Sequence, residues 1–140
     1  PNLRSPRHRV NVRFRCGDEL CAMCDEDDST EIEAAHVWDI HVIRRGAVEG
    51  DANEDQWFHA TTGNNGFWLC KYHHRSFDQD TIAINEDGKF MFKKTLSARL
   101  IREFNESLTK LRLEDDIMSP EFMAFLSLRN QRLDGHYNLF

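Results

Sequence analysis

Apolar and polar residues follow distinct patterns along the first half of the chain. Residues 31–43, EIEAAHVWDIHVI, contain β-branched and aromatic residues without Gly or Pro, which predicts a strand. Residues 44–55, RRGAVEGDANED, are polar and rich in Gly, Asn and Asp, which predicts an exposed loop. The segment TTGNNGFWLC, residues 61–70, predicts a turn at its NNG and then a short apolar strand, and residues 70–80 predict the start of a helix. The predicted order is therefore strand, loop, strand, helix.

The second half of the chain predicts a hairpin and two helices. Residues 81–92, TIAINEDGKFMF, alternate and contain an EDG turn, as in a β-hairpin. Between residues 97 and 113, apolar residues recur at steps of three and four, which predicts an amphipathic helix. Residues 121–133 predict a further helix with Pro120 in its first turn. Together the two halves indicate an α+β protein.

Length and composition indicate one globular domain. The chain has 140 residues, of which 40% are hydrophobic and ten are Phe, enough for a core of its own. No apolar run approaches the roughly 18 residues of a membrane span, and the arginine-rich start lacks the apolar segment of a signal peptide. We therefore expect a cytoplasmic protein that does not enter a membrane. Because the chain begins with Pro rather than Met, it could also be a piece of a longer protein.

The charges of the chain are segregated. The net charge is −6, yet five arginines precede the first acidic residue, and acidic residues crowd positions 18–33. Arginines in such a cluster suit contacts to phosphates, whereas the alternative is a solvated tail or a linker. We therefore predict a basic N-terminal arm or linker over residues 1–15.

Two short pairs of residues have the spacing of metal ligands. Cys21 and Cys24 are separated by two residues, and Cys70 and His73 repeat this spacing. A two-residue spacer lets a tight turn direct both side chains at one ion, and Zn²⁺ prefers thiolate and imidazole ligands in tetrahedral geometry. The four residues predict a structural Cys3His zinc site with a long insert between the pairs. Cys16 is expected to be an ordinary core or surface thiol, although it could replace one of these ligands.

The segments AAHV, NNGFWLC and KYHHRSFDQDTIAI, in this order, resemble the HNH endonuclease superfamily with its ββα-metal motif. The branch with Ala-Ala-His, Asn-Gly and His-His-x-x-Phe-Asp, common in restriction endonucleases, is the most similar. The resemblance covers about residues 16–92 and implies a nuclease core between the zinc pairs. Residues 93–140 would then be a helical extension of the same domain.

The resemblance implies three catalytic positions. His36 matches the general base, Asn65 matches the asparagine that braces the loop carrying the base, and His74 matches a ligand of a catalytic Mg²⁺ or Mn²⁺ ion. Ordinary structural roles remain open: His36 could lie on a strand face, and Asn-Gly is a common turn dipeptide. The roles of His73 and His74 could also be exchanged, since His74 follows Cys70 by four residues and could reach the same zinc.

One position departs from the pattern of many HNH enzymes. They carry a metal ligand directly before the general base, where this chain has Ala35. Another side chain could supply that ligand, or phosphate oxygens and water could complete the shell. Asp39, His41 and Asp78 are candidates, although Asp39 and His41 should face away from the base on a regular strand, and Asp78 could equally cap the next segment.

These inferences predict a metal-dependent endonuclease that cuts double-stranded DNA, with modified bases as one substrate class, as the cleavage domain of a restriction system. Cutting both strands would favour a homodimer. An RNase or a nickase would use the same chemistry. The alternative from another class is a catalytically inactive zinc module that binds DNA or protein. Four aromatic residues could stack on bases or simply pack: Trp38, Trp57, Phe58 and Trp68.

Overall fold

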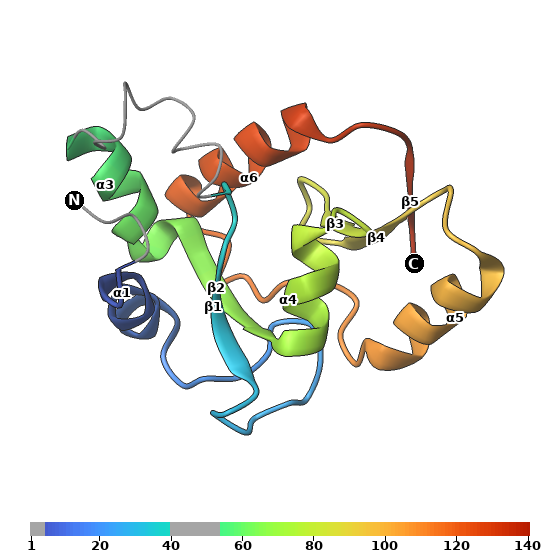
Figure 1. Cartoon of the computed structure of the whole chain (residues 1–140), viewed down its shortest axis with the longest axis horizontal. Helices are drawn as coiled ribbons and strands as arrows, with labels where there is room; N and C mark the ends of the chain where they lie inside the picture. Colours follow the sequence, from blue (N-terminus) through green and yellow to red (C-terminus); the bar gives the residue numbers. More distant parts are fainter. Residues whose placement is uncertain (1–4, 40–53) are drawn as a thin grey trace.

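A two-stranded antiparallel sheet lies at the centre of the molecule (Figure 1). The computed structural model describes residues 5–39 and 54–140. Strand β1 (Ile32–His36) pairs with β2 (Gly66–Cys70), so that Ile32 lies opposite Cys70 and His36 opposite Gly66. The strand predicted over residues 31–43 is therefore shorter than expected and ends at His36; its last four residues lie outside the described residues.

Helix α4 (Lys71–Asp78) follows β2 directly and contacts both central strands. The Cys70 side chain caps it by accepting a hydrogen bond from the main-chain N–H of His73. Phe77 of α4 packs edge to face against Phe67 of β2, with ring centroids 5.4 Å apart. Two antiparallel strands followed by a helix are thus present, as the sequence predicted for residues 61–80.

Helix α1 (Arg7–Cys16) packs against this hairpin on the side away from α4 (Figure 1). The sequence suggested an arm or a linker here, but Val12 is fully buried and Arg15 donates hydrogen bonds to the carbonyls of Gly63 and Ile117. A guanidinium that pairs with several buried carbonyls stabilises the fold and is not available to a phosphate. Arg4 lies outside the described residues.

Helix α3 (Glu54–Thr61) was not predicted, because the loop was expected to continue to residue 55. Glu54 and Asp55 lie in its first turn, where negative charge favours the positive end of the helix dipole. A short 3-10 helix, η1 (Gly63–Asn65), then leads into β2 at the predicted turn. The rest of the predicted loop, residues 44–53, lies outside the described residues.

The second sheet has the order β3-β4-β5. The predicted hairpin is present as β3 (Ile82–Ile84) and β4 (Phe90–Lys93), and Gly88 adopts φ 78° in the turn between them. Strand β5 (Tyr137–Leu139) pairs with β4 and was not predicted.

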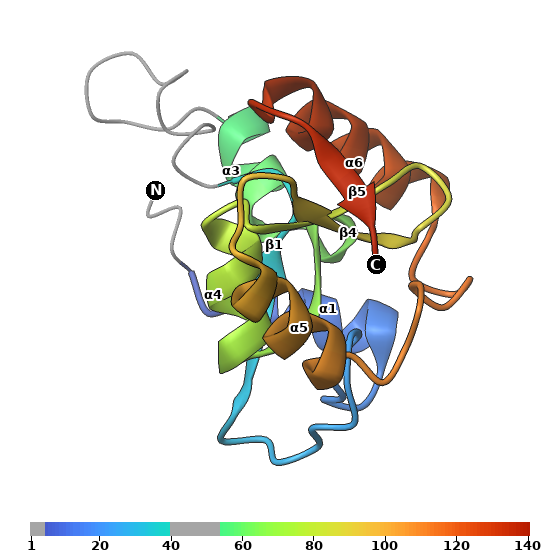
Figure 2. The ribbon, with the colours of Figure 1, turned by 90° about the vertical axis from the view of Figure 1, so that its right-hand side faces the viewer.

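Two helices flank this sheet. Helix α5 (Ala98–Ser107) is shorter than the prediction, because Leu108 is extended and the chain beyond it runs back to pair Arg112 with Lys89. Figure 2 shows α5 beside α4, where the rings of Tyr72 and Phe104 lie 5.8 Å apart. Helix α6 (Pro120–Arg132) agrees with its prediction, including Pro in the first turn.

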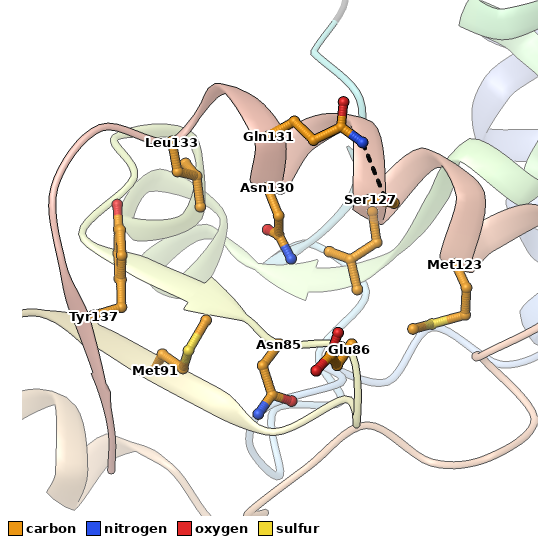
Figure 3. Close-up of a pocket in the computed structure, with 10 residues that line it drawn as sticks. Asn85, Glu86, Met91, Met123, Ser127, Asn130, Gln131, Leu133 and Tyr137 are labelled. Atoms are coloured by element: carbon orange, nitrogen blue, oxygen red, sulfur yellow. Dashed lines mark hydrogen bonds between the residues drawn. The ribbon is translucent and has the colours of Figure 1, made fainter.

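A pocket of about 410 Å³ lies between α6 and the second sheet (Figure 3). Met91, Met123 and Leu126 form part of its apolar wall, and Asn85 and Asn130 contribute amides. None of the side chains predicted to act in catalysis or zinc binding lines it. Among the described helices, none is both long and apolar enough to cross a membrane.

Candidate functional site

The four residues predicted as zinc ligands lie together in the structure. The ligand atoms of Cys21, Cys24, Cys70 and His73 all lie within 4.8 Å of one another. Three of the four are buried, and Cys24 is half-buried. Cys16 is not part of this group, in agreement with its expected role as an ordinary thiol.

The distances within this cluster fit a tetrahedral zinc site. Zinc bonds of about 2.3 Å to sulfur and about 2.0 Å to nitrogen place two sulfurs roughly 3.8 Å apart, and a sulfur and a nitrogen roughly 3.6 Å apart. Sγ of Cys24 lies 3.9 Å from Sγ of Cys70, and Nδ1 of His73 lies 3.7 Å from Sγ of Cys21 and 3.3 Å from Sγ of Cys70. The residues therefore form a Cys3His group that could hold zinc.

Ser107 of α5 orients the imidazole of this cluster. Nε2 of His73 lies 2.9 Å from Oγ of Ser107, whose hydroxyl donates to the carbonyl of Phe104 at 2.6 Å. Because that hydroxyl proton is engaged, Nε2 carries the ring proton and Nδ1 presents its lone pair to the cysteines. A hydrogen bond from Cys70 also lowers the pKa of Cys21, which favours the thiolate that a metal requires. Sequence reasoning missed Ser107, because it lies 34 residues from His73.

One ring nitrogen of His36 is hydrogen-bonded to the protein main chain. Its Nε2 lies 2.7 Å from the carbonyl oxygen of Ala60, so Nε2 must donate and Nδ1 holds the lone pair. Within the described residues Nδ1 has no hydrogen-bond partner, and it is not among the fully enclosed unpaired atoms. Burial lowers the pKa of His36 below its ordinary value, which keeps the ring neutral near pH 7.

Asn65 is a buried connection between the end of β1 and the end of α3. Its Oδ1 accepts from the N–H of Trp38 at 2.7 Å, and its Nδ2 donates to the carbonyls of Trp38 at 3.1 Å and His59 at 2.9 Å. The side chain is fully buried. Because Ala60, the partner of His36, follows His59 directly, Asn65 supports the segment that orients this histidine.

His8 of α1 lies on the face of His36 and was not predicted to have any role. The two rings are 3.7 Å apart between centroids and nearly parallel, at 9°. Nε2 of His8 lies 3.1 Å from the carbonyl oxygen of Asn65, so it donates there. Burial, together with the neighbouring His36, lowers the pKa of His8 to about 3. His8 is thus a neutral, buried imidazole.

His74 lies apart from the zinc cluster, between two carboxylates. Its Nδ1 is 2.9 Å from Glu33 and its Nε2 is 3.2 Å from Asp78. Burial opposes the charge of the imidazole, but the hydrogen bonds and charges of Asp78 and Glu33 outweigh it and raise the pKa of His74. An open cavity of about 460 Å³ lies here, lined also by the exposed side chains of Lys71 and Arg75.

The structure groups the predicted residues into neighbouring sites. His73 belongs to the Cys3His cluster, and His74, one residue further along α4, does not. His36 does not line the cavity at His74, but His74, Asp78 and Asp39 are close enough for their charges to act on its pKa. His41 lies outside the described residues.

The aromatic candidates for base stacking are largely engaged within the protein. Trp68 is buried and donates from its indole to the carbonyl of Gly17, and Trp38 packs against His59 and Phe125. Trp57 lies under the guanidinium of Arg7, whereas Phe58 is 59% exposed.

A mixed α+β fold in which a Cys3His cluster and further histidines surround a strand pair and one helix defines a small metal-site domain. Residues 21–85 match a family model described as HNH endonuclease. This part of the chain is thus similar to the HNH endonuclease family, and it contains the cysteine and histidine pairs, the hairpin, α4 and every predicted site residue. No curated protein matches the chain. This similarity covers residues 21–85 only.

Proposed function

We propose that the chain is a metal-dependent endonuclease that hydrolyses DNA phosphodiester bonds, as the cleavage domain of a restriction endonuclease. The observation that carries this proposal is the state of His36: a neutral imidazole, oriented through Nε2, whose Nδ1 holds the lone pair. This is the state that a general base requires before it removes a proton from water. The match of residues 21–85 to the HNH endonuclease family supports it independently.

In the proposed reaction, Nδ1 of His36 takes a proton from a water molecule as the oxygen attacks phosphorus in line. The bond from phosphorus to the 3′ oxygen breaks, and the leaving oxygen takes a proton from a second water molecule. Once protonated, His36 keeps its bond to Ala60, because Nε2 donates in both states. Asn65 holds this geometry by joining the segments on either side of the base.

The residues around His74 fit a divalent ion. Imidazole and carboxylate oxygens are ligands of Mg²⁺ and Mn²⁺, and an ion held there would stabilise charge on the phosphate and on the leaving oxygen. His74 would bind it, and Glu33 is a further candidate ligand. Glu33 precedes Ala35 by two residues on β1, so both side chains are on the same face of the strand. We propose that Glu33 or Asp78 supplies the metal ligand that many HNH enzymes carry at the position of Ala35.

The charges near His74 suit a phosphate backbone. Lys71 and Arg75 line the cavity and are exposed, so they can contact phosphates without disrupting the core. A restriction role would use this module on double-stranded DNA, with unmodified or modified bases as the substrate. Cutting both strands with one such site per chain would favour a homodimer.

Cleavage of supercoiled plasmid, unmodified and modified, tests the proposal in the presence of Mg²⁺ or Mn²⁺. We expect nicked or linear product that requires the ion and disappears in His36→Ala. His136→Ala is the matched control, because His136 is exposed and should leave cleavage unchanged. If the folded, zinc-bound wild type cuts neither plasmid but binds DNA, the chain is a zinc-stabilised binding module. The absence of a ligand at Ala35 is the observation that favours that second function.

A further inference from the structure

We propose that His8 is a positioning residue for His36, acting by stacking its neutral imidazole on the ring of the base. This inference rests on the proposed function, because it assigns His36 the role of base. It adds helix α1, which lies outside the stretch matched by the family model, to the machinery of the site.

The stacking contact restricts the orientation of His36 in a way that one hydrogen bond does not. The bond from Nε2 to Ala60 fixes one atom of the ring, and the ring could still turn about that bond. His8 lies 3.7 Å from it, almost parallel, and therefore fixes the plane of the ring. With the plane fixed, the lone pair at Nδ1 has one direction, which is the condition for proton transfer to a placed water.

Burial and a hydrogen bond fix the position of His8, as positioning of His36 requires. It is only 4% exposed, and its Nε2 donates to the carbonyl of Asn65. Gly66 makes room for it, because a Cβ at that position would lie 2.5 Å from Nε2 of His8. Gly66 has φ −174°, which any residue can adopt, so the glycine is required for space and not for its conformation. The Asn65-Gly66 dipeptide thus leaves space for His8 of α1 in addition to forming the turn.

A stacked neutral ring also suits the change of charge on His36. When His36 accepts a proton, a cation forms next to the flat face of His8, and a π face attracts a cation. A protonated His8 would repel it. The low pKa of His8 keeps its ring neutral at neutral pH, so of these two histidines only His36 accepts the proton. Beyond this pair, the charges of His74, Asp78 and Asp39 act on His36 and remain the same in every His8 variant.

The test compares His8→Ala, His8→Phe and His8→Gln with the wild type, in the full chain with zinc bound. NMR of the histidine rings reports the pKa of His36 and, through relaxation, the mobility of its ring, and plasmid cleavage across pH reports kcat and KM separately. Phe retains a flat ring, whereas Gln retains only a donor toward the Asn65 carbonyl. His136→Ala is the control for removal of a histidine that lies elsewhere.

We expect His8→Ala and His8→Gln to lower kcat by roughly 10- to 100-fold with KM unchanged, as a small misplacement of a catalytic group does. The ring of His36 should then become more mobile, with Nε2 still protonated because Ala60 still accepts from it, and its pKa should rise toward its ordinary value. His8→Phe should restore most of the rate and the fixed ring. If His8→Ala unfolds, the comparison of Phe with Gln makes the same distinction.

Three results would overturn the inference: variants without a ring that equal the wild type, a Phe variant no better than Gln, or a set of His8 variants that all fail to fold. The last would make His8 a structural residue only. If the wild type cuts no DNA, yet the mobility of the His36 ring increases in His8→Gln and not in His8→Phe, the positioning stands and the proposed nuclease function fails.

Discussion

Asn65→Asp tests whether Asn65 is a buried brace or only a turn residue. The substitution hardly changes the shape of the side chain, and Asp is as common as Asn before Gly in turns. In the structure, however, Nδ2 donates to the carbonyls of Trp38 and His59, and a carboxylate cannot donate. Two partly buried carbonyls lose their partner at about 1–3 kcal/mol each, and a charge is placed at a fully buried position. We expect the free energy of unfolding to fall by about 3–5 kcal/mol.

Urea unfolding at fixed zinc concentration measures this change as a shift of the midpoint at constant slope. For a domain of this size, the expected loss corresponds to a decrease in Tm of roughly 10–20 °C. Asn64→Asp is the matched control, because its side chain is half-buried and only approaches Ser119 Oγ at 3.4 Å, so it should change stability by less than about 0.5 kcal/mol. If both variants are equally stable, Asn65 serves only the turn, and the bracing role is refuted.

Other substitutions separate the remaining roles. His73→Ala should release zinc and unfold the chain, because a structural zinc contributes much of the folding energy of such a site. His74→Ala should lose cleavage but retain one zinc per chain, as measured by mass spectrometry. If His74→Ala loses the zinc and His73→Ala retains it, the two histidines have the opposite roles. His8 should make the free energy of unfolding depend on pH. Above pH 6.5 the ring is neutral in both the folded and the unfolded protein. Below pH 6.5 the unfolded protein binds a proton that the folded protein binds only near pH 3, so stability falls as the pH is lowered from 6.5 to 3. Thermal unfolding of His8→Phe should therefore show a shallower fall of Tm between pH 6.5 and 4 than the wild type, and an identical slope would contradict the low pKa. Arg129→Leu should lower the free energy of unfolding by about 3–5 kcal/mol, since it removes a 2% exposed guanidinium bound to main-chain carbonyls, while the exposed Arg132→Leu should have little effect by the same urea assay.

Local patterns were sufficient where the relevant residues are close in the chain. The spacing of Cys21 with Cys24 and of Cys70 with His73 predicted the Cys3His cluster, because a two-residue spacer already directs both side chains to one point. The strand β2, helix α4 and the hairpin after it were also predicted, since each carries its own periodicity and turn residues. Helix α3 was missed because its first residues are acidic and resemble the polar loop before it.

The patterns also misjudged residues whose role depends on distant partners. Among the arginines before residue 16, which suggested contacts to phosphate, Arg15 donates to Gly63 and Ile117, the latter 102 residues away, whereas Arg7, Arg9 and Arg13 are exposed. Helix α5 ends at Ser107, earlier than its apolar periodicity indicated, because the following residues extend toward the turn of the second hairpin. Periodicity describes which face of an element is apolar and not where tertiary contacts end the element.

The sequence alone was enough to indicate a resemblance to HNH endonucleases, the metal-ligand spacing and the order of the elements, because these depend on residues that are neighbours in the chain. Only the tertiary structure showed that Glu33 meets His74 across 41 residues, that Ser107 orients His73 across 34, and that His8 donates to Asn65 across 57 and stacks on His36. Such contacts form when separate elements pack, and the packing of α1, β1, α4 and α5 against one another is a property of the whole core that no local spacing contains.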